Sequence, residues 1–311
     1  MPHLTGPSSA RTQLDLEGVP KDVIDAYHLD RLPLQRPVTS TAELLRLDGK
    51  VALVTGGGGQ GLGNAICQRL AEQGARIAIL DVNAESGHAA ADDLARTWGA
   101  EACAFAANVA DWDSTHDAVS AVAAQFGTID ILINNAGGSG AIGTSGNKVG
   151  GRTSTFSMMD RADMEITVGV NLFGVLHVTR AVLDVMLPRR SGRIINISSE
   201  GGKVGGPSLA VYSSCKAAII ALTRNLAHDL GPEGVSIVAV CPSIMVSERL
   251  LKGGLLTAKI DDTPLGASFR RTTIGRISMA DEVASMVAFL ASEAGSYVHG
   301  TAVSVGGGFS D

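Results

Sequence analysis

From Lys50 onward, short apolar runs alternate with longer stretches in which apolar residues recur every three or four positions. The runs have the length and β-branched content of buried strands, and the longer stretches have the period of amphipathic helices. The pattern predicts strands at 51–54, 76–80, 102–107, 131–133, 193–197, 235–240 and 301–305. Helices are expected at about 62–73, 84–98, 112–126, 160–186, 212–230 and 281–291. We therefore expect one doubly wound, Rossmann-type α/β domain with a parallel sheet of seven strands and helices on both faces.

Residues 1–45 lack this regularity. Half of the ten prolines fall there, and the helical periods are short, near 23–29 and 42–47. We interpret this segment as an irregular extension that precedes a domain spanning 46–311. It is either a disordered tail or a segment that docks on this subunit or a neighbouring one. The apolar residues that favour docking are Val23, Ile24, Tyr27, Leu29, Leu32 and Leu34.

Composition excludes several classes of protein. A hydrophobic fraction of 45% and a charged fraction of 18% are typical of a soluble globular protein. The net charge of −6 offers no basic surface for nucleic acid or anionic membrane, and no apolar run reaches membrane-spanning length. The scattered cysteines, without a C-x-x-C pair, indicate buried thiols in a reducing, cytoplasmic compartment, with no metal site. They are Cys67, Cys103, Cys215 and Cys241.

A glycine-rich stretch, 55–63, lies directly between the first predicted strand and the first predicted helix. Glycine permits a tight turn and close approach to a phosphate, whose charge the helix N-terminus favours. Asp81, at the end of the second strand, is placed to accept hydrogen bonds from a ribose and would repel a 2′-phosphate. No Lys or Arg lies between Thr55 and Asn64 to counter that repulsion. The pattern favours NAD over NADP, although Asp81 could instead be an ordinary helix cap.

Other polar residues follow neighbouring predicted strands. Open α/β sheets bind ligands at the carboxyl ends of their strands. Asn108 and Val109, after the third strand, are expected beside the adenine. Asn134 and Gly137, after the fourth strand, are expected along the other side of the cofactor.

Tyr212 and Lys216 lie four residues apart in a predicted helix, so their side chains share one face. A neighbouring ammonium favours the phenolate, which makes a tyrosine an acid/base suited to near-neutral pH. Ser199, just after the fifth strand, could hydrogen-bond the substrate oxygen that exchanges a proton with Tyr212. The alternative is that Tyr212 and Lys216 form an ordinary surface pair.

Taken together, these residues resemble the short-chain dehydrogenase/reductase family from about Leu47 to the C-terminus. The matching motifs are the turn 55–63, Asp81, Asn108-Val109, Asn134-Asn135-Ala136-Gly137, Asn171, Ser199, Tyr212-x-x-x-Lys216, Cys241-Pro242-Ser243 and Gly306-Gly307-Gly308. The resemblance implies that Tyr212 is the acid/base, while Lys216 lowers the pKa of Tyr212 and holds the nicotinamide ribose. It further implies that Ser199 orients the substrate oxygen and that Asn171 holds a water linked to Lys216.

The resemblance also implies a set of cofactor-binding residues. They are Gly56, Gln60, Gly61, Leu62, Gly63, Asp81, Val82, Asn108, Val109, Asn135, Ala136, Gly137, Tyr212, Lys216, Pro242, Met245 and Ser247. The chain departs from the family pattern in three places. The glycine-rich turn is one residue longer than usual, and Pro242-Ser243 replaces the usual Pro-Gly, with Ser247 where Thr is common. The Gly-rich insertion 138–157 either walls the substrate pocket or forms a solvent loop.

These observations support an enzyme that transfers a hydride between NAD(H) and a secondary alcohol or ketone. The apolar segment 244–270 suggests a lid over an apolar or cyclic substrate, although ordinary packing would give the same composition. The alternatives are an NADPH-dependent ketoreductase of 3-oxoacyl thioesters and a nucleotide-sensing protein with little turnover. The resemblance implies a homotetramer or homodimer joined through the helices at 160–186 and 212–230.

Overall fold

The computed structural model describes residues 18–27, 40–138, 156–206, 209–246 and 270–309. The chain forms two compact units, Met1–Leu44 and Leu45–Asp311. The described part of the first unit holds two short helices, α1 (Lys21–Ala26) and α2 (Thr41–Leu44). Leu29, Leu32 and Leu34, three of the residues that favoured docking, lie outside the described residues.

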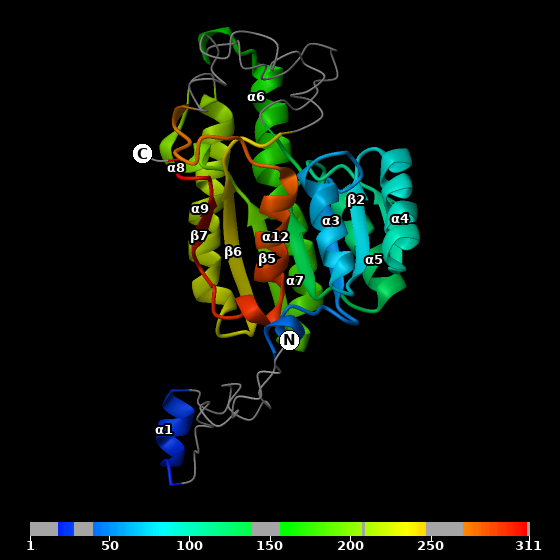
Figure 1. Ribbon diagram of the computed structural model, residues 1–311, viewed down its shortest axis with the longest axis vertical. Helices are drawn as coiled ribbons and strands as arrows, with labels where there is room; N and C mark the ends of the chain where they lie inside the picture. Colours follow the sequence, from blue (N-terminus) through cyan, green and yellow to red (C-terminus); the bar gives the residue numbers. More distant parts are fainter. Residues whose placement is uncertain (1–17, 28–39, 139–155, 207–208, 247–269, 310–311) are drawn as a thin grey trace, which may run out of the picture. The chain divides into compact units, whose positions relative to one another are not determined.

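The second unit is built on a parallel sheet with the strand order β3-β2-β1-β4-β5-β6-β7 (Figure 1). This order and the parallel pairing confirm the predicted Rossmann-type fold. The predicted strands are all present and differ from the observed ones only at their ends. They are β1 (Val51–Thr55), β2 (Arg76–Asp81), β3 (Ala102–Ala106), β4 (Ile131–Asn134), β5 (Gly192–Ile197), β6 (Val235–Pro242) and β7 (Ala302–Val305).

Helices cover both faces of the sheet (Figure 1). Successive strand residues point to opposite faces, so Ala52 and Val54 pack in one core while Val51 and Leu53 pack in the other. Because each face has its own core, the strands are mostly apolar instead of alternating with polar residues. The first core is covered by α3 (Leu62–Glu72), α4 (Ala84–Trp98) and α12 (Ala280–Ala291), and the second by α5 (Trp112–Phe126), α7 (Gly174–Met186) and α9 (Ala210–Leu230).

The helix predicted at 160–186 contains a wider turn. It consists of α6 (Arg161–Val168), a π turn (Gly169–Phe173) and α7. The Gly174 N–H bonds the Gly169 carbonyl, five residues back, as a π turn requires. Residues 161–189 are long and apolar enough to cross a membrane, but half of their most apolar window is buried inside the protein. Core helices commonly have these properties.

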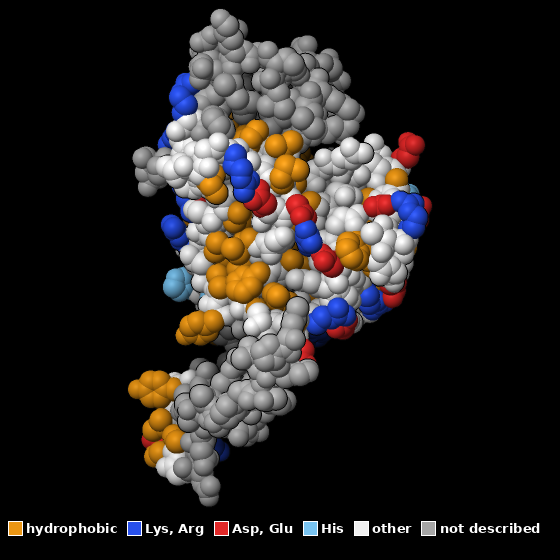
Figure 2. All heavy atoms as spheres, viewed as in Figure 1, with side chains coloured by type: hydrophobic (Ala, Val, Ile, Leu, Met, Phe, Trp, Pro, Cys, Tyr) orange, Lys and Arg blue, Asp and Glu red, His pale blue; other side chains and the backbone are white. Residues whose placement is uncertain are grey.

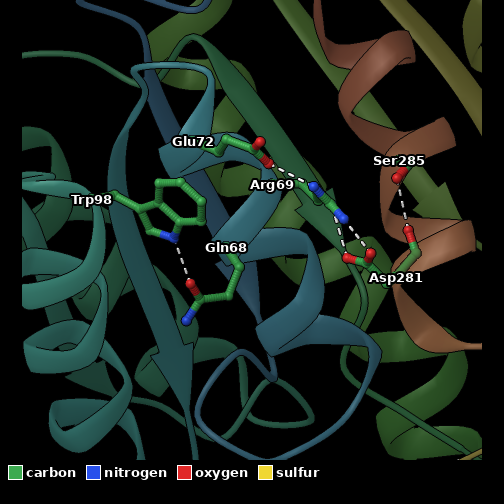
Figure 3. A network of polar contacts seen from close by, with 6 residues as sticks. All are labelled: Gln68, Arg69, Glu72, Trp98, Asp281 and Ser285. Atoms are coloured by element: carbon green, nitrogen blue, oxygen red, sulfur yellow. Dashed lines mark hydrogen bonds and ion pairs between the residues drawn. The ribbon is translucent and has the colours of Figure 1, made fainter.

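Polar contacts connect α3 to the helices on either side (Figure 3). Arg69 Nε donates to Asp281 Oδ1 of α12 at 2.8 Å, and Arg69 Nη1 donates to Glu72 at 2.7 Å. Trp98 Nε1 of α4 donates to Gln68 Oε1 at 2.5 Å, and Ser285 Oγ donates to the backbone carbonyl of Asp281. Figure 2 shows side chains of opposite charge paired across this face of the unit. Exposed pairs of this kind contribute little to stability.

A chain of buried side-chain hydrogen bonds crosses the second core. Asn134, the last residue of β4, donates its Nδ2 hydrogens to Asn196 Oδ1 at 2.8 Å and to Thr179 Oγ1 of α7 at 2.9 Å. Asn196, its register partner on β5, donates to Thr223 Oγ1 of α9 at 3.0 Å. All four residues are buried. The expectation that Asn134 lines the cofactor is therefore wrong, because its side chain faces the helices beneath the sheet.

Replacing Asn196 by Ala tests whether these buried hydrogen bonds stabilise the fold. The substitution removes the acceptor of Asn134 and the donor to Thr223, and it leaves a cavity, so we expect a loss of about 2–4 kcal/mol in unfolding free energy. Urea denaturation measures the loss. The control is Thr97→Ala, an exposed position of α4, where the change should stay within about 0.5 kcal/mol. Equal effects at the two positions would contradict the proposed role of the buried chain.

Candidate active site

The polar residues singled out in the sequence gather at one edge of the sheet, because all strands are parallel and end there. The strand order reverses between β1 and β4, which is where open α/β sheets form a ligand-binding crevice. The residues at this edge are the turn 56–61 after β1, Asp81 on β2, Asn108 after β3, Asn135 to Gly137 after β4, Ser199 after β5 and Pro242 on β6.

The glycine-rich turn brings the end of β1 into backbone contact with the start of α3. A Cβ atom at Gly63 would lie 2.1 Å from the Gly56 carbonyl oxygen, so no other residue fits there. Gly56 itself has a φ of +67°. Asn135 Nδ2 donates to the carbonyls of Thr55 and Gly56, which holds the turn against the segment after β4. The result is a cradle that fits a dinucleotide pyrophosphate.

The extra residue in this turn does not block the helix N-terminus. The first intrahelical bond of α3 runs from the Ala65 N–H to the Gly61 carbonyl, so the N–H groups of Leu62, Gly63 and Asn64 precede it and can bind an anion. The N–H of Gly58 is already engaged, since it donates to Asp81 Oδ2 at 2.9 Å. Gln60, another predicted contact, is exposed.

The Asp81 carboxylate can accept further hydrogen bonds in addition to those from two backbone N–H groups. Oδ2 accepts from Gly58 N–H and Oδ1 from Asn83 N–H at 3.0 Å, so each oxygen retains a lone pair for a ribose hydroxyl. Asp81 is not the cap of α4, because Asn83 occupies that position and accepts from the Ser86 N–H. Val82, the next residue, is 77% exposed.

Sequence reasoning missed Gly87 of α4, which borders the same turn. A Cβ atom at Gly58 would lie 2.7 Å from the Gly87 nitrogen, so the turn packs directly on α4. No local sequence signal indicates this contact, because it depends on how α4 crosses the sheet. Cys67 of α3 also borders the turn, and burial raises the pKa of its thiol to about 12, which leaves it unreactive.

The segments after β3 and β4 are held by short local contacts. Thr55 Oγ1 accepts from the N–H groups of both Asn135 and Ala136 at 2.9 Å. Asn108 is exposed and its Oδ1 accepts from the Ala110 N–H, whereas Val109 is buried. The side chain of Asn108 is thus accessible at the predicted adenine edge, and Val109 contributes mainly packing.

The π turn carries Asn171, which is fully buried. Asn171 Oδ1 accepts from the Gly138 N–H at 2.9 Å, and Nδ2 donates to the carbonyls of Thr167 and Gly138. A Cβ atom at Gly137 would lie 2.6 Å from Asn171 Oδ1 and 3.6 Å from Lys216 Nζ. Asn171 Oδ1 and Lys216 Nζ therefore both lie close to Gly137.

Tyr212 and Lys216 share one face of α9, as their spacing predicted. The Lys216 Nζ lies 5.7 Å from the centre of the Tyr212 ring and donates to the Ile197 carbonyl at 2.8 Å. Lys216 is only 3% exposed, and this burial lowers the pKa of its ammonium to about 8. The pair is consequently no ordinary surface pair, because the lysine is deep in the protein.

Ser199 follows β5 and precedes α8 (Gly201–Val204). Its Oγ accepts from the Gly201 N–H at 3.0 Å. The neighbouring Ser198 Oγ donates to the Lys216 carbonyl at 2.7 Å, which ties this segment to α9. Sequence reasoning missed Glu200, which is buried with its Oε1 only 3.1 Å from the Cβ position of Gly306.

The remaining predicted residues lie near the end of β6. Pro242 ends the strand, and Met245 forms an isolated bridge with Ser278. Ser247, the lid residues 247–269 and the insertion residues 139–155 lie outside the described residues. Cys215 and Cys241 are buried, and burial raises the pKa of each thiol. Within the described ranges, no group of His, Cys, Asp or Glu side chains could hold a metal ion.

Comparison with known proteins agrees with this geometry. Residues 50–252 match the family model for short chain dehydrogenases. D-threitol dehydrogenase of Mycolicibacterium smegmatis is 35% identical over 85% of this chain and 94% of its own. A 3-oxoacyl-[acyl-carrier-protein] reductase, FabG of Aquifex aeolicus, is 33% identical over 85% of this chain and 98% of its own.

Solved structures give the same result. A 7α-hydroxysteroid dehydrogenase complexed with NADH and 7-oxo glycochenodeoxycholic acid has a TM-score of 0.76, at 28% identity over 87% of this chain and 98% of that one. An NAD⁺-bound xylitol dehydrogenase has a TM-score of 0.73, at 31% identity over 83% of this chain and 98% of that one. With this family match, its sheet order and its glycine cradle, the chain belongs to the short-chain dehydrogenase family of oxidoreductases.

Proposed function

We propose that this protein is an NAD-dependent dehydrogenase that interconverts a secondary alcohol and a ketone. The observation that carries the proposal is the buried Lys216, whose Nζ lies 5.7 Å from the centre of the Tyr212 ring and donates to the Ile197 carbonyl at the end of β5. A nicotinamide bound there would supply the hydride acceptor or donor. The chain's own side chains then have to bind the substrate oxygen and move its proton.

Tyr212 takes the hydroxyl proton when the alcohol is oxidised and returns it when the ketone is reduced. Lys216 is close to the Tyr212 ring and carries a positive charge below its pKa of about 8, so it favours the phenolate there. Ser199 holds the substrate oxygen near the phenol. Asn171 fixes Gly138, and through it the segment that borders the cofactor.

The preference for NAD follows from Asp81. Its carboxylate accepts two backbone N–H groups and so is held in place, where it can bind ribose hydroxyls and repel a 2′-phosphate. Because NAD pools favour oxidation, we propose the oxidative direction. We further propose an apolar or cyclic alcohol, from the composition of the segment 244–270. The other residues expected from the sequence to bind the cofactor, including Gly61, Leu62 and Met245, belong to the same proposed site.

We propose a homo-oligomer, dimer or tetramer, joined through the helix pair α6–α7 and α9. Exposed Ala217 and Ala221 on α9 would allow close approach of a second copy. Light scattering that gives the mass of one chain would refute this. We also propose a cytoplasmic location, because the four cysteines are free thiols, as in a reducing compartment.

Tyr212→Phe removes the acid/base group without changing the ring. We expect turnover to fall by at least about 100-fold, while NADH affinity, measured by fluorescence titration, changes less than about threefold. Tyr297→Phe is the matched control, since Tyr297 is 98% exposed, and it should keep full activity. Substantial turnover in the Tyr212 variant would exclude Tyr212 as the acid/base.

Asp81→Ala should relax discrimination against the 2′-phosphate. We expect the ratio of kcat/KM for NAD to that for NADP to fall by roughly tenfold or more, because the variant no longer places a negative charge against the 2′-phosphate. The repulsion between two such charges is worth up to a few kcal/mol. Glu85→Ala removes one exposed charge from α4 nearby and should leave the ratio unchanged. A native enzyme that prefers NADP would instead favour the 3-oxoacyl thioester ketoreductase.

Lys216→Met tests the cost of burying the lysine. The folded-state pKa of about 8 lies below the ordinary lysine pKa of 10.5, so between these pH values the unfolded chain binds more protons and the wild type gains stability as pH rises. Below pH 8 the wild type bears the full cost of a buried charge. We therefore expect the inactive variant to be at least as stable as the wild type at pH 7.

Urea denaturation at pH 7 and pH 9.5 measures the difference between the two proteins. From pH 7 to pH 9.5, the unfolding free energy of the wild type should rise relative to that of the variant by an amount of order 1 kcal/mol or more. A difference that is independent of pH would show that Lys216 titrates no differently in the folded and unfolded chains.

A further inference from the structure

The backbone of Gly58 connects the glycine-rich turn to two other elements. The Gly58 N–H donates to Asp81 Oδ2, at the end of β2, at 2.9 Å. A Cβ atom at Gly58 would lie 2.7 Å from the Gly87 nitrogen of α4 and 2.9 Å from both the Gly87 Cα and the Ser86 carbonyl carbon. Gly58 does not have a positive φ, so its neighbours, and not its own backbone angles, exclude a side chain there.

The close approach to α4 keeps the turn within reach of Asp81. The atoms that a Cβ would meet belong to a helix backbone, so they cannot rotate aside as a side chain could. α4 is packed in the first core, whereas Gly59 and Gln60 of the turn are exposed, so a larger residue at position 58 would displace the turn. The Gly58 nitrogen would move with it, and its bond of 2.9 Å can lengthen by only a few tenths of an ångström before it is lost.

The orientation of the Asp81 carboxylate depends on this bond. One backbone N–H holds each oxygen, since Oδ2 accepts from Gly58 and Oδ1 accepts from Asn83 at 3.0 Å. The torsion that turns an aspartate carboxylate has broad minima, so a single N–H fixes it poorly. Two N–H groups from different segments, the turn and the start of α4, restrict the carboxylate to one orientation.

We propose that Gly58 determines cofactor specificity as a positioning residue for Asp81. By holding Oδ2, it keeps the carboxylate in the orientation that binds the ribose hydroxyls of NAD and opposes the 2′-phosphate of NADP. Discrimination between the two cofactors then requires a glycine in the turn as well as a charge at the end of β2. The inference rests on the role of Asp81 given under the proposed function.

Gly58→Ala tests this role. We expect the ratio of kcat/KM for NAD to that for NADP to fall by about threefold to tenfold, because the carboxylate loses one hydrogen bond that orients it. The change should appear mainly as a higher KM for NAD, since Asp81 binds the cofactor and takes no part in the proton transfer. The matched control is Gly59→Ala, at an exposed position where a Cβ would meet no atom of the described residues within 4 Å. Gly59→Ala should keep the wild-type ratio.

The ratio separates this role from a merely structural one. A turn that only loses its shape weakens the pyrophosphate contacts of both cofactors alike, so a fall in both activities at an unchanged ratio would overturn the proposal. In the Asp81→Ala protein, Gly58→Ala should leave the ratio where Asp81→Ala has placed it, because the carboxylate on which Gly58 acts is gone. A second fall by the same factor in that background would also overturn the proposal.

Amide hydrogen exchange tests the same contact without any change at Gly58, so it applies even if Gly58→Ala does not fold. The Gly58 N–H should exchange at least about tenfold faster in Asp81→Ala than in the wild type, while exchange at Gly59 stays the same. Equal exchange at Gly58 in the two proteins would overturn the proposal.

Asp81→Ala by itself distinguishes the two levels of the argument. If it keeps the wild-type ratio, the role of Asp81 in the proposed function is wrong, and the role of Gly58 falls with it. If Asp81→Ala lowers the ratio while Gly58→Ala keeps it, the role of Gly58 alone is overturned. The expected result is a lower ratio in both variants, with no further fall when they are combined.

Discussion

Two asparagine amides buried between the central strands set the geometry on which the active site depends. The Nδ2 groups of Asn134 and Asn196 donate to partners on one neighbouring strand and two helices. The elements joined in this way are the same ones that carry the site. β4 leads to the cofactor segment, β5 to Ser199, α7 follows the turn of Asn171, and α9 carries Tyr212 and Lys216. A short chain of hydrogen bonds therefore fixes the relative position of groups that are far apart in sequence.

The site combines this rigid support with an energetic cost. Lys216 is buried without a carboxylate beside it among the described residues, and its Nζ donates to a carbonyl oxygen instead. A lone buried cation is unfavourable, which is why the pKa of Lys216 falls. The same burial brings the lysine close to the Tyr212 ring and strengthens its field there. The position is thus suited to proton transfer and not to stability.

Much of the fold could be predicted from the sequence, because strands buried on both faces are continuous apolar runs and amphipathic helices keep their period. The same reasoning placed Asp81 and Ser199 at one edge, since parallel strands end together, and helical spacing placed Tyr212 and Lys216 on one face of α9. It could not predict the π turn at 169–173, because one extra residue in a turn hardly changes the hydrophobic period. It placed Asn134 wrongly, because a residue at a strand end can turn to either face. The approach of Gly58 to Gly87, and that of Glu200 to Gly306, depend on long-range packing and have no local signal.

The contact between Glu200 and Gly306 has a consequence for how this scaffold can vary. The Oε1, Cγ and Cδ atoms of Glu200 lie 3.1–3.3 Å from the position that a Cβ atom would take at Gly306. A side chain at position 306 would therefore require the Glu200 carboxyl group to move by a few tenths of an ångström. Gly306 does not have a positive φ, so this position is limited by its neighbour and not by its own backbone angles.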